Sequence, residues 1–167
     1  MAILVSDANI FVDMDVAGLT HAMFGLNDTF ATPDVLYHEE LSDYHSELLE
    51  LGLQIEALDG DAIAQVEQMV SMYAQVSLND LFALVLAKER GWPLLTGDRR
   101  LREVADEERV EIYGTLWLVE RLVDQEIITF GKARAAFELM RNGGRRLPWK
   151  DVDVLLARLE QPESGFS

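Results

Sequence analysis

The hydrophobic and polar positions along the chain follow two periods in turn, and this pattern predicts strands that alternate with helices. Short apolar runs are typical of buried strands, whereas apolar residues at every third or fourth position are typical of amphipathic helices. The predicted strands cover residues 2–6, 30–32 (a strand or a turn), 53–58, 92–96 and 110–113. The predicted helices cover residues 8–16, 18–26, a segment that begins at Pro33, 61–75, 78–90, part of 97–108, 115–124, 130–142 and 150–160. This order predicts an α/β fold, namely a three-layer α/β/α sandwich with a central parallel sheet and additional C-terminal helices.

Local signals refine two of the predicted helices. Ser77 is a favourable N-terminal capping residue for the helix at 78–90, and Gly91 is suited to end that helix. In the helix at 61–75, the apolar spacing predicts a buried side that consists of Ile63, Val66, Val70 and Tyr73.

Two acidic residues follow predicted strands. Asp7 comes immediately after the first strand, and Asp98 follows the strand at 92–96 with one residue between them. Because ligands of open parallel sheets bind at the carboxyl ends of the strands, we expect both carboxylates at that edge. Asp13, further along the helix that follows Asp7, is expected to be an ordinary exposed acid.

Helix periodicity places two further acids. Asp80 lies in the first turn of the helix at 78–90, in line with apolar residues three, four and seven positions later, so we expect it to point toward the protein. Glu40 has helical spacing with Leu36 and Leu41, which predicts a position near the inner face of its helix. Its neighbour Glu39 is expected to be exposed.

Each of these acids also has a structural explanation. Asp80 could complete a capping arrangement with Ser77, and Asp98 could be a helix N-cap. Glu40 could be a solvated helix residue. Asp7 is harder to explain in this way, because Asp is poorly tolerated in a buried strand.

A shared site would explain the four acids together. Unpaired carboxylates that lie close to one another raise each other's pKa values, and a divalent cation relieves the repulsion. The chain has no cysteine, and its three histidines are too scattered to form a metal pair. An all-oxygen ligand set of this kind predicts Mg²⁺ or Mn²⁺ and not zinc.

The charge of the chain is divided unequally along its length. The net charge at pH 7 is −16; residues 1–87 contain 15 Asp and Glu and no Lys or Arg, whereas residues 88–167 contain all 14 Lys and Arg with 15 acids. A nucleic acid would therefore have to contact the second half, although an acidic surface can also serve solubility alone. We expect no membrane association and a cytoplasmic location, because the N-terminus lacks a secretory pattern and no apolar run reaches the roughly 18–20 residues that span a bilayer.

Three stretches resemble motifs of the PIN-domain family, in particular of its VapC-type toxin ribonucleases. ILVSDANIFVD (3–13) resembles a first motif, a strand followed by Asp-x-Asn, and TPDVLYHEEL (32–41) resembles a second, in which Glu precedes Leu. Residues 76–122 combine Ser-x-x-Asp, an Ala-rich helix, a short strand, Thr-x-Asp, another strand and Gly-Thr. The resemblance implies a PIN-like nuclease domain at 1–125. Residues 126–167 would be a helical C-terminal extension packed on the same domain.

The resemblance also implies roles for individual residues. The metal-binding and catalytic acids would be Asp7, Glu40, Asp80 and Asp98. The supporting polar residues would be Asn9, Ser77 and Thr96. The residues that follow Asp98 and could hold phosphates are Arg99, Arg100 and Arg102, although acids in the same helix could instead engage them in weak surface ion pairs.

A metal-dependent endoribonuclease is the function that the resemblance implies. It would use Mg²⁺ or Mn²⁺, act on RNA, and be the toxin of a toxin–antitoxin pair, with an antitoxin protein as partner and homodimers common among its relatives. The alternative is a non-catalytic PIN-like protein that acts through protein–protein binding. A phosphatase with an aspartate nucleophile is disfavoured, because such enzymes need a second Asp at the position of Asn9.

Overall fold

A five-stranded parallel sheet organises the fold, with β1 at its centre. The computed structural model describes residues 2–43 and 45–161. The strands are β1 (Ile3–Ser6), β2 (Thr29–Pro33), β3 (Gln54–Glu56), β4 (Leu94–Leu95) and β5 (Ile112–Tyr113), and their order in the sheet is β3-β2-β1-β4-β5. All four strand pairs are parallel, so the predicted central parallel sheet is confirmed. The carboxyl ends of all five strands therefore meet at one edge.

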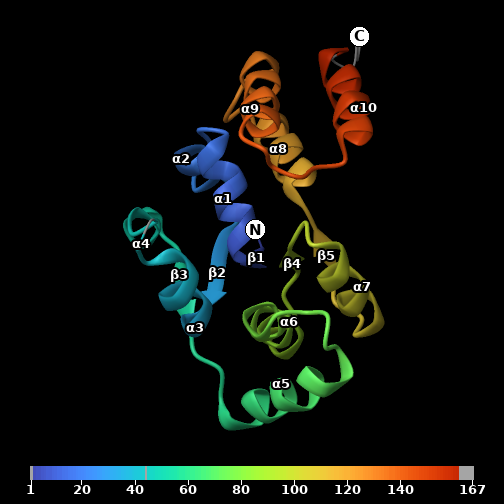
Figure 1. Cartoon of the computed structure of the whole chain (residues 1–167). Coiled ribbons are helices and arrows are strands. Elements are labelled where there is room, and N and C mark those ends of the chain that lie inside the picture. The colour runs from blue at the N-terminus through green and yellow to red at the C-terminus, as the bar shows by residue number, and fades with distance from the viewer. Residues whose placement is uncertain (1, 44, 162–167) are drawn as a thin grey trace.

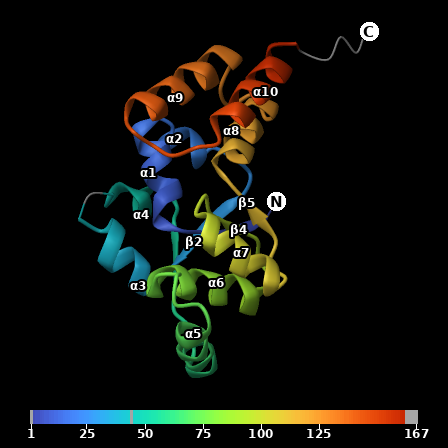
Figure 2. The same cartoon turned by 45° about the vertical axis from the view of Figure 1, so that its right-hand side comes forward.

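Helices cover both faces of this sheet (Figures 1 and 2). They are α1 (Ala8–Val16), α2 (Thr20–Met23), α3 (Asp34–Leu36), the π-helix η1 (Tyr37–Leu41), α4 (Glu47–Leu51), α5 (Gly60–Met72), α6 (Leu78–Arg90), α7 (Arg99–Glu107), α8 (Thr115–Asp124), α9 (Phe130–Asn142) and α10 (Trp149–Glu160). On one side, α6 contacts β1, β2 and β4, and α5 packs outside α6. On the other side lie α1, α2 and α8, with α9 and α10 beyond them. The predicted three-layer α/β/α architecture is confirmed.

The central helix α6 shows why the sequence folds in this way. The Ser77 side chain accepts a hydrogen bond from the Asp80 backbone N–H at its start, and Gly91 ends it with a left-handed backbone (φ 69°). Six of its side chains are buried, namely Leu81, Ala83, Leu84, Val85, Leu86 and Ala87. A helix that is apolar on most of its circumference suits a position between the sheet and α5.

The predicted buried side of α5 is wrong in part. Ile63 and Val70 are 41% and 46% exposed, whereas Ala62, Val66 and Met69 are buried against the protein. The helix is therefore rotated relative to the expected orientation, and both Ile63 and Val70 are in contact with solvent.

The C-terminal helices pack on the rest of the fold. α9 contacts α1 and α8, and α10 contacts α8 and α9. Residues 162–167 of the expected extension lie outside the described part of the chain. Among the described residues, no helix is long and apolar enough to span a membrane.

Candidate functional site

Asp7 follows the central strand directly and begins α1 at the carboxyl edge of the sheet. Its side chain is almost completely buried, with the residue 1% exposed. Oδ1 accepts a hydrogen bond from the backbone N–H of Ile10 at 3.1 Å, so Asp7 is the N-cap of α1. Oδ2 accepts a hydrogen bond from the Thr96 hydroxyl at 2.5 Å. Both oxygens of this carboxylate are thus fixed by the protein.

Thr96 connects the ends of two neighbouring strands. It is fully buried just after β4, and while its hydroxyl donates to Asp7 it also accepts a hydrogen bond from the backbone N–H of Asp98 at 3.1 Å. This double contact links Asp7 to the start of α7. Thr96 therefore fixes the position of Asp7 relative to Asp98, which the Thr-x-Asp motif alone does not reveal.

Burial makes Asp7 an unusual acid. Desolvation raises the pKa of Asp7 from its ordinary value of 3.8 to about 7, although the hydrogen bonds from Thr96 and Ile10 act in the opposite direction. The negative charges of Asp80 and Asp13 raise this pKa further. A carboxyl group with a pKa near neutrality is typical of functional sites.

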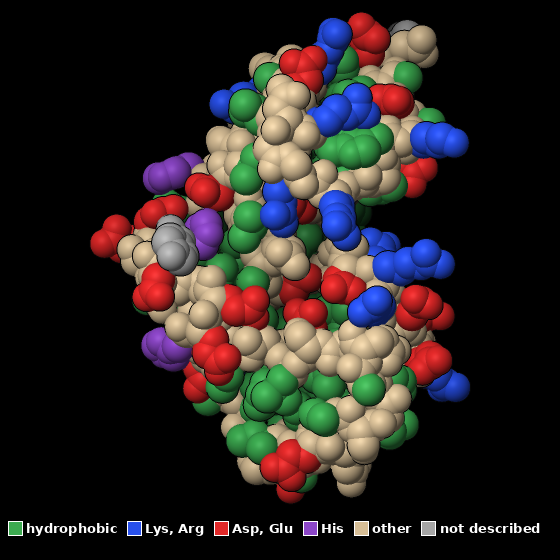
Figure 3. Space-filling model, viewed as in Figure 1, with side chains coloured by type: hydrophobic (Ala, Val, Ile, Leu, Met, Phe, Trp, Pro, Cys, Tyr) green, Lys and Arg blue, Asp and Glu red, His purple; other side chains and the backbone are tan. Residues whose placement is uncertain are grey.

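Asp80 shows the same effect at the start of α6. Desolvation raises its pKa to about 6, a hydrogen bond with Ser77 lowers it, and the charges of Asp98 and Glu40 raise it. The four predicted acids are therefore close enough for their charges to interact, with Asp7 coupled to Asp80 and Asp80 coupled to the other two. Figure 3 shows Asp and Glu side chains gathered across a hollow in the middle of this face.

Asp98 caps the N-terminus of α7, which is the structural explanation that the sequence allows for it. Its Oδ1 atom accepts hydrogen bonds from the backbone N–H groups of Arg100 (2.8 Å) and Leu101 (3.1 Å), which makes it the N-cap of α7. The capping uses only one of the two carboxylate oxygens. The helix cap and a ligand role are therefore compatible in the same side chain.

Glu40 lies differently from the expectation. It is exposed, as is Glu39, and the Nδ2 atom of Asn79 donates to both of them, at 2.9 Å to Glu40 and 3.4 Å to Glu39. The local helix is a π-helix, whose wider turn changes which side chains face inward. Asn79 holds Glu40 beside Asp80 but at the solvent side of the cluster.

The buried acids of this protein fall into two kinds. Asp13 is only 6% exposed, so the expectation of an ordinary exposed acid is wrong. It accepts hydrogen bonds from Arg145 Nε at 2.6 Å and from the Thr115 hydroxyl at 2.8 Å. Asp28 is likewise buried and paired with Arg121 at 2.6 Å. By contrast, among the described residues none of the four predicted acids has a Lys, Arg or His within 4.0 Å.

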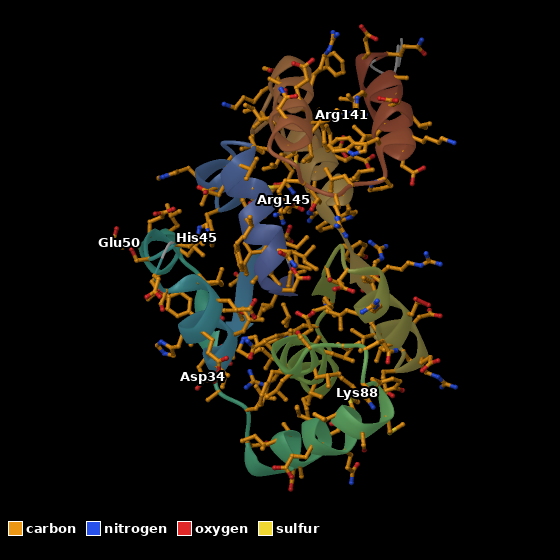
Figure 4. All side chains as sticks on the ribbon, viewed as in Figure 1. Asp34, His45, Glu50, Lys88, Arg141 and Arg145 are labelled. Atoms are coloured by element: carbon orange, nitrogen blue, oxygen red, sulfur yellow. The ribbon has the colours of Figure 1, made fainter. Side chains whose placement is uncertain are left out.

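A signal for Asp13 was present in the sequence. Ile10, Asp13, Met14 and Ala17 follow the spacing of one helix face, and all four are buried. An acid on an apolar stripe needs a cationic partner, and the partner comes from the turn between α9 and α10 (Figure 4). Arg145 also donates from Nη2 to Oδ1 of the exposed Asn9, at 3.4 Å. The predicted supporting residue Asn9 is therefore in contact with the C-terminal segment.

The three predicted phosphate-binding arginines differ in their contacts. Arg99 lies 3.9 Å from Glu103 in an exposed ion pair, as the alternative interpretation expects. Arg102 is exposed and donates from Nη1 to the backbone oxygen of Thr96 at 3.3 Å, which holds it next to the acid cluster. Arg100 is also exposed.

A second group of potential ligands lies elsewhere on the surface. The ligand atoms of Asp15, His45 and Glu47 lie within 4.8 Å of one another. Within residues 2–43 and 45–161, no three of the predicted acids meet this criterion. The carboxylates of the predicted cluster thus interact electrostatically, but their oxygen atoms lie further apart than those of ligands that jointly coordinate one ion.

Comparisons with known proteins agree with this geometry. A family model described as a PIN domain (DUF3368) matches residues 3–161. The chain belongs to the PIN-domain family. The match runs through α9 and all of α10, beyond the boundary at residue 125 that the motifs suggested. No curated protein matches the chain.

A solved structure supports the PIN fold independently. The chain is similar to a PilT N-terminus domain protein from the hyperthermophilic archaeon Sulfolobus solfataricus P2, with a TM-score of 0.52 and 14% sequence identity. The similarity covers 72% of this chain and 93% of the archaeal one. At this identity the likeness concerns the fold alone. A PIN domain is a nuclease fold, and in this chain Asp7 lies at the carboxyl edge of the sheet.

Proposed function

We propose that this PIN domain is a metal-dependent endoribonuclease whose site consists of Asp7, Glu40, Asp80 and Asp98. One observation carries the proposal. The protein neutralises its buried acids Asp13 and Asp28 with arginines, but it leaves the buried Asp7 without any basic partner among the described residues. A buried carboxylate without a partner is costly, so an external cation is the natural complement.

The donor chemistry fits a hard divalent cation. The four side chains offer carboxylate oxygens only, which Mg²⁺ and Mn²⁺ prefer. Such an ion would supply Lewis acidity that lowers the pKa of a bound water and stabilises the charge on a phosphodiester during hydrolysis. The chain's own contribution would be to hold Asp7 through Ile10 and Thr96, and to keep Asp80 and Asp98 at the starts of two helices beside it.

We also propose that the protein is the toxin of a toxin–antitoxin pair, which requires an antitoxin as a protein partner. Exposed apolar residues favour such a partner. Ile63 and Val70 lie two helical turns apart on the outer face of α5, and Met72 is 64% exposed at the end of this helix. Figure 3 shows hydrophobic side chains gathered over α5 and α6 at the lower end of the molecule. Surfaces of this kind mark protein interaction sites.

The experiment that tests the nuclease is RNA cleavage by the purified chain with Mn²⁺ or Mg²⁺. We expect cleavage of a single-stranded RNA that EDTA stops, and that Asp7→Asn and Asp98→Asn reduce at least 100-fold, in line with the contribution of single groups to such electrostatic catalysis. The matched control is Asp15→Asn, which removes an exposed acid from the same helix as Asp7. It should cleave RNA as the wild type does.

Other outcomes assign the function differently. If cleavage survives Asp7→Asn but is lost in Asp15→Asn, the ion is bound by Asp15, His45 and Glu47. If no RNA is cleaved and calorimetry detects no Mn²⁺ binding at neutral pH, the alternative of a non-catalytic PIN-like binding protein is favoured.

A further inference from the structure

A large cavity of the described chain lies beside the acid cluster. Its volume is about 710 Å³, within the range of roughly 300–1,000 Å³ for small-molecule sites. Gly97 and Arg99 line it, so it borders Asp98 on both sides in sequence. Its other walls come from α7, from the β5–α8 junction, and from the segment 146–148 that precedes α10. The C-terminal segment therefore closes a space next to the proposed site.

One wall of this cavity is aromatic. Tyr113 and Trp117 both line it, and their rings are stacked with centroids 4.2 Å apart at an angle of 21°. The guanidinium of Arg121 lies 5.1 Å from the Trp117 ring, and the Tyr113 hydroxyl donates to Glu111 at 2.6 Å. The stack is thus held at both ends. Leu147 adds an apolar side chain from the C-terminal segment.

Cationic side chains also line the cavity. Arg102 and Arg146 line the cavity, are exposed, and form no ion pair within 4.0 Å among the described residues. Figure 3 shows Lys and Arg side chains on both sides of the notch between the C-terminal helices and α7. The cavity also contains acids, namely Glu103, Asp106 and Asp151. Its charges are therefore balanced, and a long polyanion would gain little from electrostatics alone.

We infer that this cavity binds an unpaired base of single-stranded RNA next to the phosphate that is cleaved. The inference rests on the proposed nuclease function and adds a subsite for one base of the RNA substrate. An aromatic wall with guanidinium groups at its rim matches what a flipped-out base and its phosphate require. A base inside a duplex is stacked and paired, so it could not enter a space walled by Tyr113 and Leu147. Binding here would depend on stacking more than on phosphate neutralisation, which is compatible with a chain of net charge −16.

The test is equilibrium binding of a short fluorescein-labelled single-stranded RNA in EDTA, followed by anisotropy so that no cleavage occurs. Tyr113→Leu should weaken binding about 5- to 150-fold, because base–aromatic stacking is worth roughly 1–3 kcal/mol. Tyr113→Phe keeps the ring and should bind as the wild type does. Arg146→Gln should reduce the slope of log Kd against the logarithm of the salt concentration by about one, as expected for one lost phosphate contact.

The matched control is Lys132→Gln, which removes one exposed positive charge from α9 outside the cavity. Its binding should equal that of the wild type, and a duplex of the same sequence should bind more weakly than the single strand. Circular dichroism checks that Tyr113→Leu is folded. If folded Tyr113→Leu and Arg146→Gln both bind RNA like the wild type, or if the duplex binds as well as the single strand, the inference is overturned.

This result is separable from the fate of the proposed nuclease. Loss of binding in Tyr113→Leu without any metal-dependent cleavage by the wild type would support an RNA-binding cavity and contradict catalysis. Efficient cleavage by a folded Tyr113→Leu with unchanged RNA affinity would support catalysis and contradict the RNA-binding cavity.

Discussion

Replacing Asp7 with Asn should stabilise the metal-free protein, although it removes a residue from the centre of the proposed site. Burial raises the pKa of Asp7 from 3.8 to about 7. Since a tenfold change in an equilibrium corresponds to about 1.4 kcal/mol, ionised Asp7 destabilises the fold by roughly 4 kcal/mol at pH 8. Asn carries no charge but loses the hydrogen bond from Thr96, which costs about 1 kcal/mol. The expected net gain in the free energy of unfolding is about 3 kcal/mol.

The pH dependence follows from the direction of the shift. The folded chain holds its Asp7 proton up to about pH 7, whereas the unfolded chain releases it near pH 3.8. Between these values the folded state binds more protons, so the stability of the wild type falls as pH rises and then levels off above pH 7. The advantage of Asp7→Asn should therefore shrink from about 3 kcal/mol at pH 8 to less than about 1 kcal/mol at pH 5.

Urea unfolding in EDTA at both pH values measures this difference. Asp28→Asn is the matched control, because Asp28 is equally buried but paired with Arg121, and its loss should destabilise the fold at both pH values. Excess Mn²⁺ should reverse the order at pH 8, because an ion at about 1,000 times its Kd adds about 4.1 kcal/mol to the wild type alone, which exceeds the expected gain of about 3 kcal/mol. If Asp7→Asn is less stable than the wild type at pH 8 in EDTA, the reasoning from an unpaired buried charge is wrong.

Two further changes test the surroundings of the cluster. Arg145→Ala should lower the free energy of unfolding by about 2–4 kcal/mol, because it leaves the buried Asp13 without its cation. Urea titration should show this loss, whereas Arg146→Ala should unfold like the wild type. Thr96→Val removes the hydroxyl whose hydrogen bond lowers the pKa of Asp7, so that pKa should rise above 7 and calorimetry should find half-maximal Mn²⁺ binding at a higher pH. An unchanged pH midpoint would show that this hydroxyl does not tune Asp7.

The order of strands and helices was predictable because it rests on local periodicity. Ser77 and Gly91, for example, bound α6 through contacts within a few residues. The buried side of α5 was not predictable in the same way. Ile63 and Val70 compete with Ala62 and Met69 for the same apolar stripe, and hydrophobicity alone favours the larger pair. Packing against α6 selects the other pair.

The candidate site was predictable only in part for a related reason. Asp7 stands out because it follows a buried strand, and a sequence motif is enough to find it. Glu40 is exposed in a π-helix, whose hydrogen bonds join residues five positions apart instead of four. No pattern of residue types in the sequence predicts this change. The apolar helix face could have indicated that Asp13 is buried, but not that its cationic partner is Arg145, which lies 132 positions away in the sequence. Contacts over such distances are fixed by tertiary packing and not by local preference.

The uneven distribution of charge along the chain acquires a structural meaning from these contacts. The first half has no Lys or Arg, so an arginine partner for its buried acids must come from the second half. Arg121 in α8 does this for Asp28, and Arg145 after α9 does it for Asp13. Since Arg145 lies beyond residue 125, the C-terminal helices complete the electrostatics of α1 instead of forming a separable addition. Among its described residues, the second half contributes no such partner to Asp7. This difference between Asp7 and the two paired acids is the reason that we propose a cation from solution as its complement.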